Sequence, residues 1–327
     1  MRWLLVLIGM WVWPFSALAG GFDVVALGAH GGLEDGNLSA YLVRPIGEDR
    51  GVLCDAGTIF NGLEMAERRG AVSAIAIPPG TSWTRSGYIA REVVKGYLIS
   101  HAHLDHVAGL LVLSPDDAPK PIYALASTNR AISQHLFNGA IWPNMGDRGN
   151  SPRIGLYHYR DLSIAVSISI DGTNLRVTAY PLSHGGIAST AFLIENGSDA
   201  LLYLGDTGPD DIEHSHALHA LWQAIALRLQ AHRLKAIMVE CSYDDSRPDQ
   251  LLFGHLSPHW LLRELREMQK IGGVSLKGLP VLVTHIKPTL KAAPAPERTI
   301  LSELEAGNSG LGVRFVIAEQ GAHWMWR

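Results

Sequence analysis

Residues 100–106, which read Ser-His-Ala-His-Leu-Asp-His, constrain this chain more than any other segment, because they directly follow the apolar run Tyr97-Leu98-Ile99. Four of these side chains are of metal-ligand type: His101, His103, Asp105 and His106. If the chain leaves a strand in extended form, positions 101, 103 and 105 project to one side, and His106 joins them once the chain turns. One tetrahedral zinc ion cannot readily be surrounded by so short a segment, so the spacing favours two cations. A solvated histidine-rich loop is the alternative, but it leaves the alternation unexplained.

Three further residues of ligand type each follow an apolar, strand-like run: His184, Asp206 and His285. Each is weak evidence alone, since a lone histidine is more often structural than a ligand. Strand ends are where α/β folds present their chemistry, so convergence of these positions with residues 101–106 is expected. The set as a whole therefore predicts a metal centre.

The composition limits the class of protein and of metal site. The 327 residues are 47% hydrophobic and 18% charged, which excludes a disordered chain. A net charge of −4 argues against a nucleic-acid polymer as partner, because such binding uses a broad basic face. Fifteen histidines against two cysteines favour imidazole and carboxylate ligands over thiolates. Cys54 and Cys241 both lie in apolar runs, and two buried thiols are at least as well supported as a disulfide.

Residues 1–19 have the pattern of a secretory signal peptide. One basic residue, Arg2, precedes an apolar stretch, and Ala17-Leu18-Ala19 supplies a small-x-small cleavage site. An uncleaved anchor is the alternative, but the stretch is at the short end of a bilayer span and contains Pro14. No later stretch is apolar for long enough to span a membrane. We therefore expect a periplasmic or secreted protein without stable membrane association after cleavage.

Short β-rich runs and helical patterns alternate along the rest of the chain. The predicted strands are 22–27, 40–44, 51–54, 97–100, 175–182, 190–194, 201–204, 237–240, 281–284 and 314–318. The predicted helices are 62–69, 128–137, 212–234 and 258–270. No linker divides the chain, so 20–327 is expected to form one domain of sheets covered by helices. The stretch 116–161 is the least regular, and we expect it to form an irregular insertion such as a lid.

The ligand-type residues, in their order along the chain, resemble the metal-binding set of the metallo-β-lactamase superfamily. Residues 101–115 also resemble the signature of the class II cyclic-nucleotide phosphodiesterases within it. Four further blocks are similar to that family, namely residues 141–144, 240–242, 254–258 and 285–288. The resemblance covers nearly all of residues 20–327. It implies an α+β fold, an αββα sandwich of two mixed β-sheets flanked by helices.

The resemblance also implies a set of site residues. His101, His103 and His184 would hold one divalent cation, Asp105, His106 and His285 the other, and the Asp206 carboxylate would bridge them. Zn²⁺ suits these ligands most readily, and Mn²⁺ or Fe are the alternatives. A hydroxide shared by two metals would attack the phosphodiester of a 3′,5′-cyclic nucleotide, with cyclic AMP as the favoured substrate, and release a nucleoside 5′-monophosphate.

Asp105 and His255 are the catalytic candidates, and His255 would protonate the leaving oxygen or bind phosphate. Its alternative role is that of a neighbour in the first turn of the helix that follows Ser257. The candidates for substrate binding are Lys287, Trp142 and Asn144. Lys287 would pair with phosphate, or lie on the surface as most lysines do. Trp142 would stack on the base, although an inward-packed loop anchor is the better-supported alternative.

Two other functions stay open at the level of sequence. The same fold could hydrolyse a thioester, a lactone or a β-lactam, because one scaffold hosts many reactions. A secreted metal-binding protein without turnover is the second alternative. A homodimer is compatible with the sequence but is not indicated by any residue.

Overall fold

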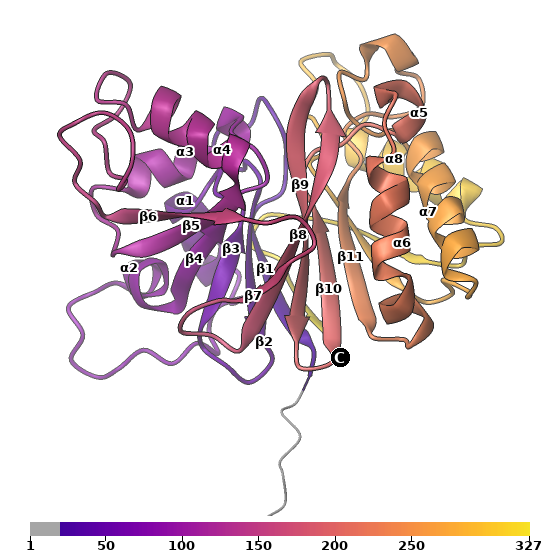
Figure 1. Ribbon diagram of the computed structural model, residues 1–327. Coiled ribbons are helices and arrows are strands. Elements are labelled where there is room, and N and C mark those ends of the chain that lie inside the picture. The colour runs from indigo at the N-terminus through magenta and orange to yellow at the C-terminus, as the bar shows by residue number, and fades with distance from the viewer. Residues whose placement is uncertain (1–19) are drawn as a thin grey trace, which may run out of the picture.

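Two seven-stranded β-sheets face each other, and helices cover their outer faces (Figure 1). The computed structural model describes residues 20–327, so the predicted signal peptide 1–19 lies outside the described residues. Both sheets combine parallel and antiparallel pairs. In the first, β3 (Gly51–Cys54) pairs with β4 (Val94–Leu98) in parallel and β1 (Phe22–Gly28) with β2 (Ala40–Pro45) antiparallel. In the second, β10 (Asp199–Leu204) pairs with β11 (Leu234–Glu240) in parallel and with β9 (Ile187–Asn196) antiparallel. The predicted sandwich of two mixed sheets flanked by helices is therefore confirmed.

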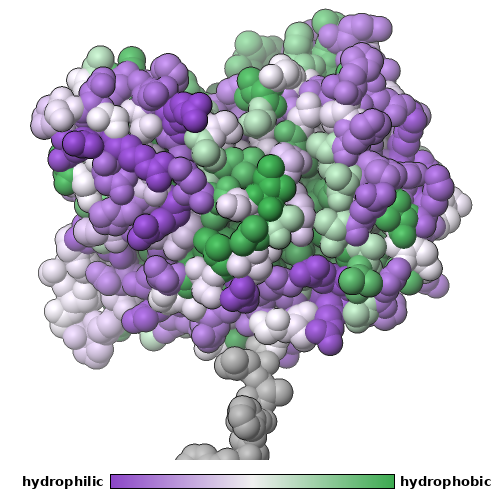
Figure 2. All heavy atoms as spheres, in the orientation of Figure 1, coloured by the Kyte–Doolittle hydropathy of each residue, from purple (hydrophilic) through white to green (hydrophobic). Residues whose placement is uncertain are grey.

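The strands of each sheet come from one half of the chain, apart from the last strand. In spatial order the first sheet consists of β14 (His323–Trp326), β1 (Phe22–Gly28), β2 (Ala40–Pro45), β3 (Gly51–Cys54), β4 (Val94–Leu98), β5 (Lys120–Leu125) and β6 (Tyr157–Leu162). The second consists of β13 (Arg314–Ile317), β12 (Pro280–Thr284), β11 (Leu234–Glu240), β10 (Asp199–Leu204), β9 (Ile187–Asn196), β8 (Leu175–His184) and β7 (Ser167–Ser169). Figure 2 shows apolar residues gathered near the middle of the face on which β7, β8 and β9 lie.

The helices divide between the two outer faces. The first half of the chain supplies α1 (Phe60–Arg68), α2 (Arg85–Tyr88), the π-helical turn Ile89–Val93, α3 (Leu104–Leu113), α4 (Ala126–Ala131) and the π-helical turn Ile132–Leu136. The second half supplies α5 (Asp210–Glu213), α6 (Ala217–Gln230), the 3₁₀ turn Asp249–Leu251, α7 (Pro258–Gly272) and α8 (Pro296–Gly307). No helix among residues 20–327 has the length and apolar character needed to cross a membrane.

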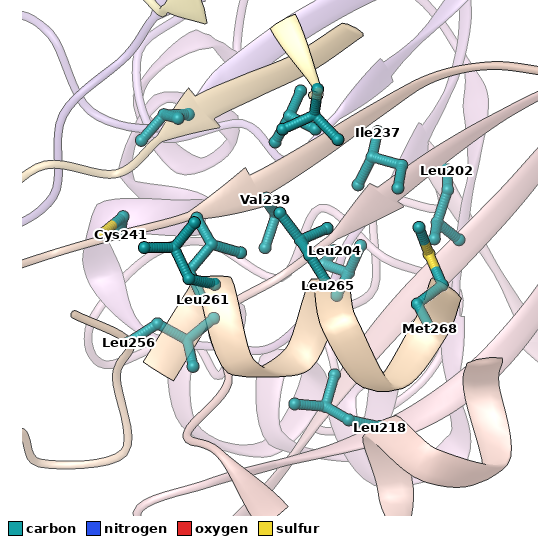
Figure 3. Packing of buried hydrophobic residues seen from close by; sticks show 14 of the residues in the cluster. Leu202, Leu204, Leu218, Ile237, Val239, Cys241, Leu256, Leu261, Leu265 and Met268 are labelled. Atoms are coloured by element: carbon teal, nitrogen blue, oxygen red, sulfur yellow. The ribbon is translucent and has the colours of Figure 1, made fainter. Parts of the chain in front are cut away.

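Helix α7 shows how the sequence fixes an outer layer. Pro258 opens the helix at a position where no backbone donor is lost, and Gly273 closes it in the left-handed conformation at φ +63°. Leu261, Leu265 and Met268 repeat at spacings of three and four, so they share one face. That face packs on the second sheet, as Figure 3 shows.

Several predicted elements differ in extent from the structure. The pattern over 212–234 predicts one helix, but the chain breaks it into α5 and α6 because His214 adopts a left-handed backbone at φ +50°. The stretch 116–161 contains β5, α4 and most of β6, and residues 137–156 are its longest part without helix or strand. Cys54 and Cys241 are both buried and free.

A buried ion pair ties this irregular region to the first sheet. Lys120 Nζ lies 2.6 Å from Asp117 Oδ1 and donates to the Ala90 carbonyl oxygen. The hydroxyls of Tyr97 and Tyr157 donate to the other carboxylate oxygen of Asp117. Burial lowers the pKa of Lys120, and the carboxylate opposes that change.

We expect Lys120→Met to destabilise the protein by about 3–5 kcal/mol, because Asp117 would keep a buried charge without its cation. The free energy of unfolding in urea measures the effect. Lys270→Met is the matched control, since Lys270 is 78% exposed and its ion pair contributes little. A loss at Lys120 no larger than at Lys270 would contradict the expectation.

Candidate active site

The residues of the first motif lie between the end of β4 and the first turn of α3. His101 and His103 lie in the segment between these two elements, and His103 has an extended backbone. Asp105 and His106 belong to α3, which begins at Leu104. The expectation that residues 101, 103 and 105 alternate along one extended segment is therefore wrong at Asp105. A helical turn places this carboxylate, and the positive end of the helix dipole favours its charge.

The three distant residues lie where strands of the second sheet end. His184 is the last residue of β8, Asp206 follows β10, and His285 follows β12 with a left-handed backbone at φ +56°. The structure thus brings all seven predicted ligand residues to one end of the sandwich. We call these seven residues, 101, 103, 105, 106, 184, 206 and 285, the His/Asp cluster.

The potential ligand atoms of the cluster fall into overlapping groups, within each of which they lie no more than 4.8 Å apart. The groups include His101–His103–His184, His101–His106–Asp206 and Asp105–His106–His285. Asp206 is central: its Oδ2 lies 3.2 Å from Nε2 of both His106 and His285, and 3.8 Å from Nε2 of His101 and His184. The carboxylate is therefore placed between the two sets of side chains that the resemblance assigns to two cations.

Two buried ring nitrogens in the cluster are left without hydrogen bonds. Nε2 of His101 and Nε2 of His106 have no hydrogen-bond partner in the described part of the chain, although both side chains are about 99% buried. Buried polar atoms normally find a partner, because an unsatisfied one costs the full desolvation penalty. Nitrogen atoms aimed at a shared carboxylate are what a divalent cation needs, so the residues present fit a metal centre.

The electrostatics of the cluster are those of carboxylates surrounded by imidazoles. Burial alone would raise the pKa of Asp206, but His106 and His285 hold it well below its usual range. Burial likewise opposes ionisation of Asp105, whose pKa is nevertheless lowered by the hydrogen bond and charge of His285. Burial lowers the pKa of His101 well below its usual value. His106 differs, because the Asp206 and Asp55 carboxylates raise its pKa well above the usual value despite its burial. The cluster therefore combines anionic carboxylates with at least one neutral imidazole, that of His101, and these are the protonation states that metal ligands require.

Asp55 orients one side of the cluster and was not identified from the sequence. Its Oδ2 lies 2.7 Å from His106 Nδ1 and also accepts the hydroxyls of Ser100 and Tyr203. The Ser100 amide donates to Oδ1. An accepting carboxylate fixes which nitrogen of His106 carries the proton and turns Nε2 toward Asp206. The sequence did contain a signal for Asp55, because it is an acidic residue directly after the strand Gly51–Cys54. Asp206 has a similar position just beyond the end of β10.

Glu240 orients the opposite side and was also missed as a site residue. His255 Nδ1 lies 2.8 Å from Glu240 Oε1, and the Ser242 hydroxyl donates to Oε2. Ser242 Oγ lies 2.9 Å from His285 Nδ1, so the same carboxylate is linked to a cluster residue. Burial raises the pKa of Glu240 to about 7, and the Asp206 carboxylate adds to the shift. Burial lowers the pKa of His255 to about 4.

His255 and Lys287 are the two other predicted residues that lie beside the cluster. The His255 ring is 4.7 Å from the His184 ring and its Nδ1 is 3.8 Å from Asp206 Oδ2. With Nδ1 facing Glu240, Nε2 is the ring nitrogen left for a ligand. Lys287 Nζ lies 3.9 Å from Asp105 Oδ2 with its side chain 21% exposed. A cation at this position can pair with an anionic substrate.

A glycine-containing loop, residues 28–37, closes over the cluster. The Gly32 amide donates to Asp105 Oδ2, and the His285 amide donates to the Ala29 carbonyl oxygen. A Cβ added to Gly31 would lie 2.2–2.5 Å from three atoms of the His285 ring. The loop therefore approaches the site with its backbone against the His285 imidazole.

Trp142 and Asn144 are not brought to the cluster by any hydrogen bond within residues 20–327. The Trp142 indole N–H donates to Ser114 Oγ, and the ring packs against the core under the first sheet. The Asn144 amide donates to the carbonyl oxygens of Arg148 and Asn150, within its own loop. These contacts hold residues 137–156 in place, and a role for either side chain in substrate binding stays a prediction.

Comparison with known proteins identifies the family. The model of the class-II cAMP phosphodiesterases matches residues 24–321, which is most of the chain. The chain belongs to this family. The resemblance seen in the sequence is therefore confirmed, and the family model spans every residue of the His/Asp cluster.

Individual members of the family are similar over nearly their whole length. The chain is 43% identical over 312 residues to the 3′,5′-cyclic-nucleotide phosphodiesterase of Aliivibrio fischeri. The aligned region covers 95% of this chain and 94% of that protein. It is 42% identical over 310 residues to a probable 3′,5′-cyclic-nucleotide phosphodiesterase of Yersinia pestis, covering 94% and 90%.

Solved structures confirm the fold. Unliganded yeast PDE1 superposes with a TM-score of 0.78 at 25% identity, covering 94% of this chain and 99% of that one. The metallo-β-lactamase fold protein YhfI of Bacillus subtilis gives a TM-score of 0.62 at 16% identity, covering 94% and 100%. The predicted metallo-β-lactamase fold is thereby confirmed.

Proposed function

We propose that this chain hydrolyses 3′,5′-cyclic AMP to the nucleoside 5′-monophosphate with two divalent cations, in a compartment outside the cytoplasm. The observation that carries the proposal is the convergence of five histidines and Asp105 around the Asp206 carboxylate, in a member of the class-II cAMP phosphodiesterases. The same residues would serve any hydrolysis at this fold. Family membership is what favours a cyclic phosphodiester over the alternatives.

The cations would be held by the two halves of the cluster. His101, His103 and His184 form one half, Asp105, His106 and His285 the other, and Asp206 lies between them. Zn²⁺ is the proposed metal on the basis of the donor set, with Mn²⁺ or Fe as alternatives. When bound, such a pair supplies an ionised water near neutral pH and neutralises phosphoryl oxygens. Asp55 orients His106 directly for this task, and Glu240 orients His285 through the Ser242 hydroxyl.

Two residues beside the cluster would neutralise the charge of the phosphate and protonate the leaving oxygen. Lys287 pairs with the phosphate as a point charge, at the edge of the cluster nearest Asp105. His255 Nδ1 faces Glu240, so Nε2 is directed to the substrate. With the Glu240 carboxyl protonated and donating to Nδ1, the Nε2 proton passes to the leaving 3′-oxygen and the Glu240 proton moves to Nδ1.

His255→Ala is expected to lower kcat for cyclic AMP by about 10²–10⁴-fold, the usual contribution of a general acid. Metal content per chain should not change, because His255 is outside the proposed ligand set. A diester with a p-nitrophenolate leaving group should be affected much less, since this group departs without a proton. Steady-state kinetics and elemental analysis make the test. Full turnover of cyclic AMP by a metal-loaded variant would exclude the role.

The substrate proposal is tested with the purified chain in the presence of Zn²⁺ or Mn²⁺. The substrates are 3′,5′-cyclic AMP, 3′,5′-cyclic GMP, a 2′,3′-cyclic nucleotide, a β-lactam and a glutathione thioester. We expect hydrolysis of the 3′,5′-cyclic nucleotides, with the highest kcat/KM for cyclic AMP. Hydrolysis of only the last two substrates would refute the proposal, and no turnover of any substrate by a metal-loaded protein would favour a binding protein.

The location outside the cytoplasm rests on residues 1–19, which lie outside the described part of the chain. Its test is the N-terminal sequence of the protein recovered from the producing cell and from its periplasm or medium. Cleavage after Ala19 is the expected result. A chain that starts at Met1 and stays with the cytoplasmic fraction would contradict it.

A further inference from the structure

Large apolar side chains are exposed around the His/Asp cluster. A site that bound only an anion would not need apolar groups there. Four residues share this position: Leu33, Leu104, Ile187 and Phe253. Their exposed fractions lie between 42% and 62%, well above those of the core. We call these four residues the apolar rim. Exposed apolar side chains that lie together often mark a surface that binds a ligand or a partner.

Three of the rim residues are placed by direct connections to cluster residues. Leu104 lies between the cluster residues His103 and Asp105 in the chain. Ile187 is the pairing partner of His184 across the turn between β8 and β9. Leu33 follows Gly32, whose amide donates to Asp105. The rim therefore comes from separate segments of the chain that come together at the cluster.

Phe253 is the fourth member and has a strained backbone. Its φ of +52° lies in the left-handed region, which bulky side chains rarely adopt. Burial of the ring does not explain this conformation, because Phe253 is 59% exposed. The next residue, Gly254, packs so closely against the backbone at Gly185 that an added Cβ would lie 2.1 Å from the Gly185 nitrogen. Strain of this kind gathers at ligand sites, where the surrounding structure holds it in place.

Cation–π and edge-to-face contacts connect the Phe253 ring with His255 beside the cluster. The Arg247 guanidinium carbon lies 5.5 Å from the centre of the Phe253 ring and 4.3 Å from that of Tyr243. The Tyr243 ring lies in turn 5.8 Å from the His255 ring. The contacts thus run outward from His255 and end at an exposed aromatic ring.

We propose that the apolar rim binds the base of the cyclic nucleotide and that Phe253 is the side chain that stacks on it. The inference rests on the proposed function, in which the phosphate occupies the His/Asp cluster. A 3′,5′-cyclic nucleotide carries its base one ribose ring away from the phosphate, so the base must leave the cluster at the rim. Aromatic rings stack on bases irrespective of hydrogen-bonding pattern.

Phe253 thereby takes the role that the sequence suggested for Trp142. The Trp142 indole N–H is bonded to Ser114 and the ring packs on the core, so its contacts are those of a loop anchor. Phe253 combines what Trp142 lacks: a largely exposed ring and a position two residues from His255.

The test compares Phe253→Asn with Phe253→Trp. Asparagine tolerates the left-handed conformation better than phenylalanine, so this variant is expected to fold with equal or higher thermal stability. Its KM for cyclic AMP should rise about five- to hundredfold, the range that a lost stacking contact gives, while kcat changes less than twofold. Phe253→Trp should keep the parental KM.

A base-free substrate and a neighbouring residue supply the controls. Ribose 3′,5′-cyclic phosphate without a base should give the same kcat/KM with the parent and with Phe253→Asn. Leu251→Asn, in the same loop and 44% exposed, should leave KM for cyclic AMP unchanged. An unchanged KM for cyclic AMP in Phe253→Asn, or an equal loss with the base-free diester, overturns this inference alone. A parent that hydrolyses neither diester overturns the proposed function, and this inference with it.

Discussion

Asp206→Asn is expected to lower turnover of cyclic AMP by about a thousandfold or more and to reduce the metal content of the purified protein. The substitution keeps the size of the side chain and removes the charge around which the imidazoles of His106 and His285 gather at 3.2 Å. A bridging carboxylate acts on both proposed cations, and metal catalysis supplies several kcal/mol to such reactions, which corresponds to at least a thousandfold.

Elemental analysis and steady-state kinetics on the same preparation measure both effects of Asp206→Asn. The control is Asp199→Asn, at the other end of the same strand β10, where the carboxylate forms an ion pair with Lys235 at 3.3 Å near the surface. This variant should keep its metal and its turnover. If Asp206→Asn retained the parental metal content and rate, Asp206 would not be the carboxylate shared by the two proposed cations. Another residue would have to take that place in the proposed site.

The fold could be predicted where the hydrophobic pattern of a segment and the residues that bound it indicate the same element. The strand 51–54 coincides with β3, and α7 lies close to its predicted bounds because Pro258, an amphipathic repeat and Gly273 all give the same answer. The helix α3 was missed, although it carries Asp105 and His106. Its run of apolar residues from Val107 to Leu113 has little amphipathic contrast, so periodicity gave no signal there.

The ligand residues could be predicted because each lies at the end of a strand or within a few residues beyond it, and a sandwich brings strand ends together. The orienting residues are harder to find, since their role depends on contacts between distant segments. Glu240 lies at the end of β11 and acts through Ser242 and His255, which a single sequence does not connect. Phe253 was missed for another reason: nothing in its neighbours signals the left-handed backbone that it adopts next to the close packing of Gly254 on Gly185.

Gly31→Ala is the second change with a large expected effect, at a residue that neither binds a proposed metal nor carries a side chain. The added methyl group would lie 2.2–2.5 Å from the His285 ring, well inside van der Waals contact. His285 cannot readily move aside, because Ser242 Oγ lies 2.9 Å from Nδ1 and the backbone amide donates to Ala29. Either the ring or the loop must shift, and a displacement of about 1 Å in a catalytic group costs roughly a hundredfold in rate.

We therefore expect Gly31→Ala to lower kcat for cyclic AMP by about a hundredfold, with a fall in metal content if the His285 ring is what moves. Gly36→Ala is the matched control within the same loop, because its methyl group would meet only the amide end of the Asn61 side chain, at 3.1 Å. That variant should stay within a few-fold of the parent, since a flexible surface side chain can give way. If Gly31→Ala kept the parental activity and metal content, the loop would be free to move away from His285. The close contact between Gly31 and the His285 ring would then not help to position that ring.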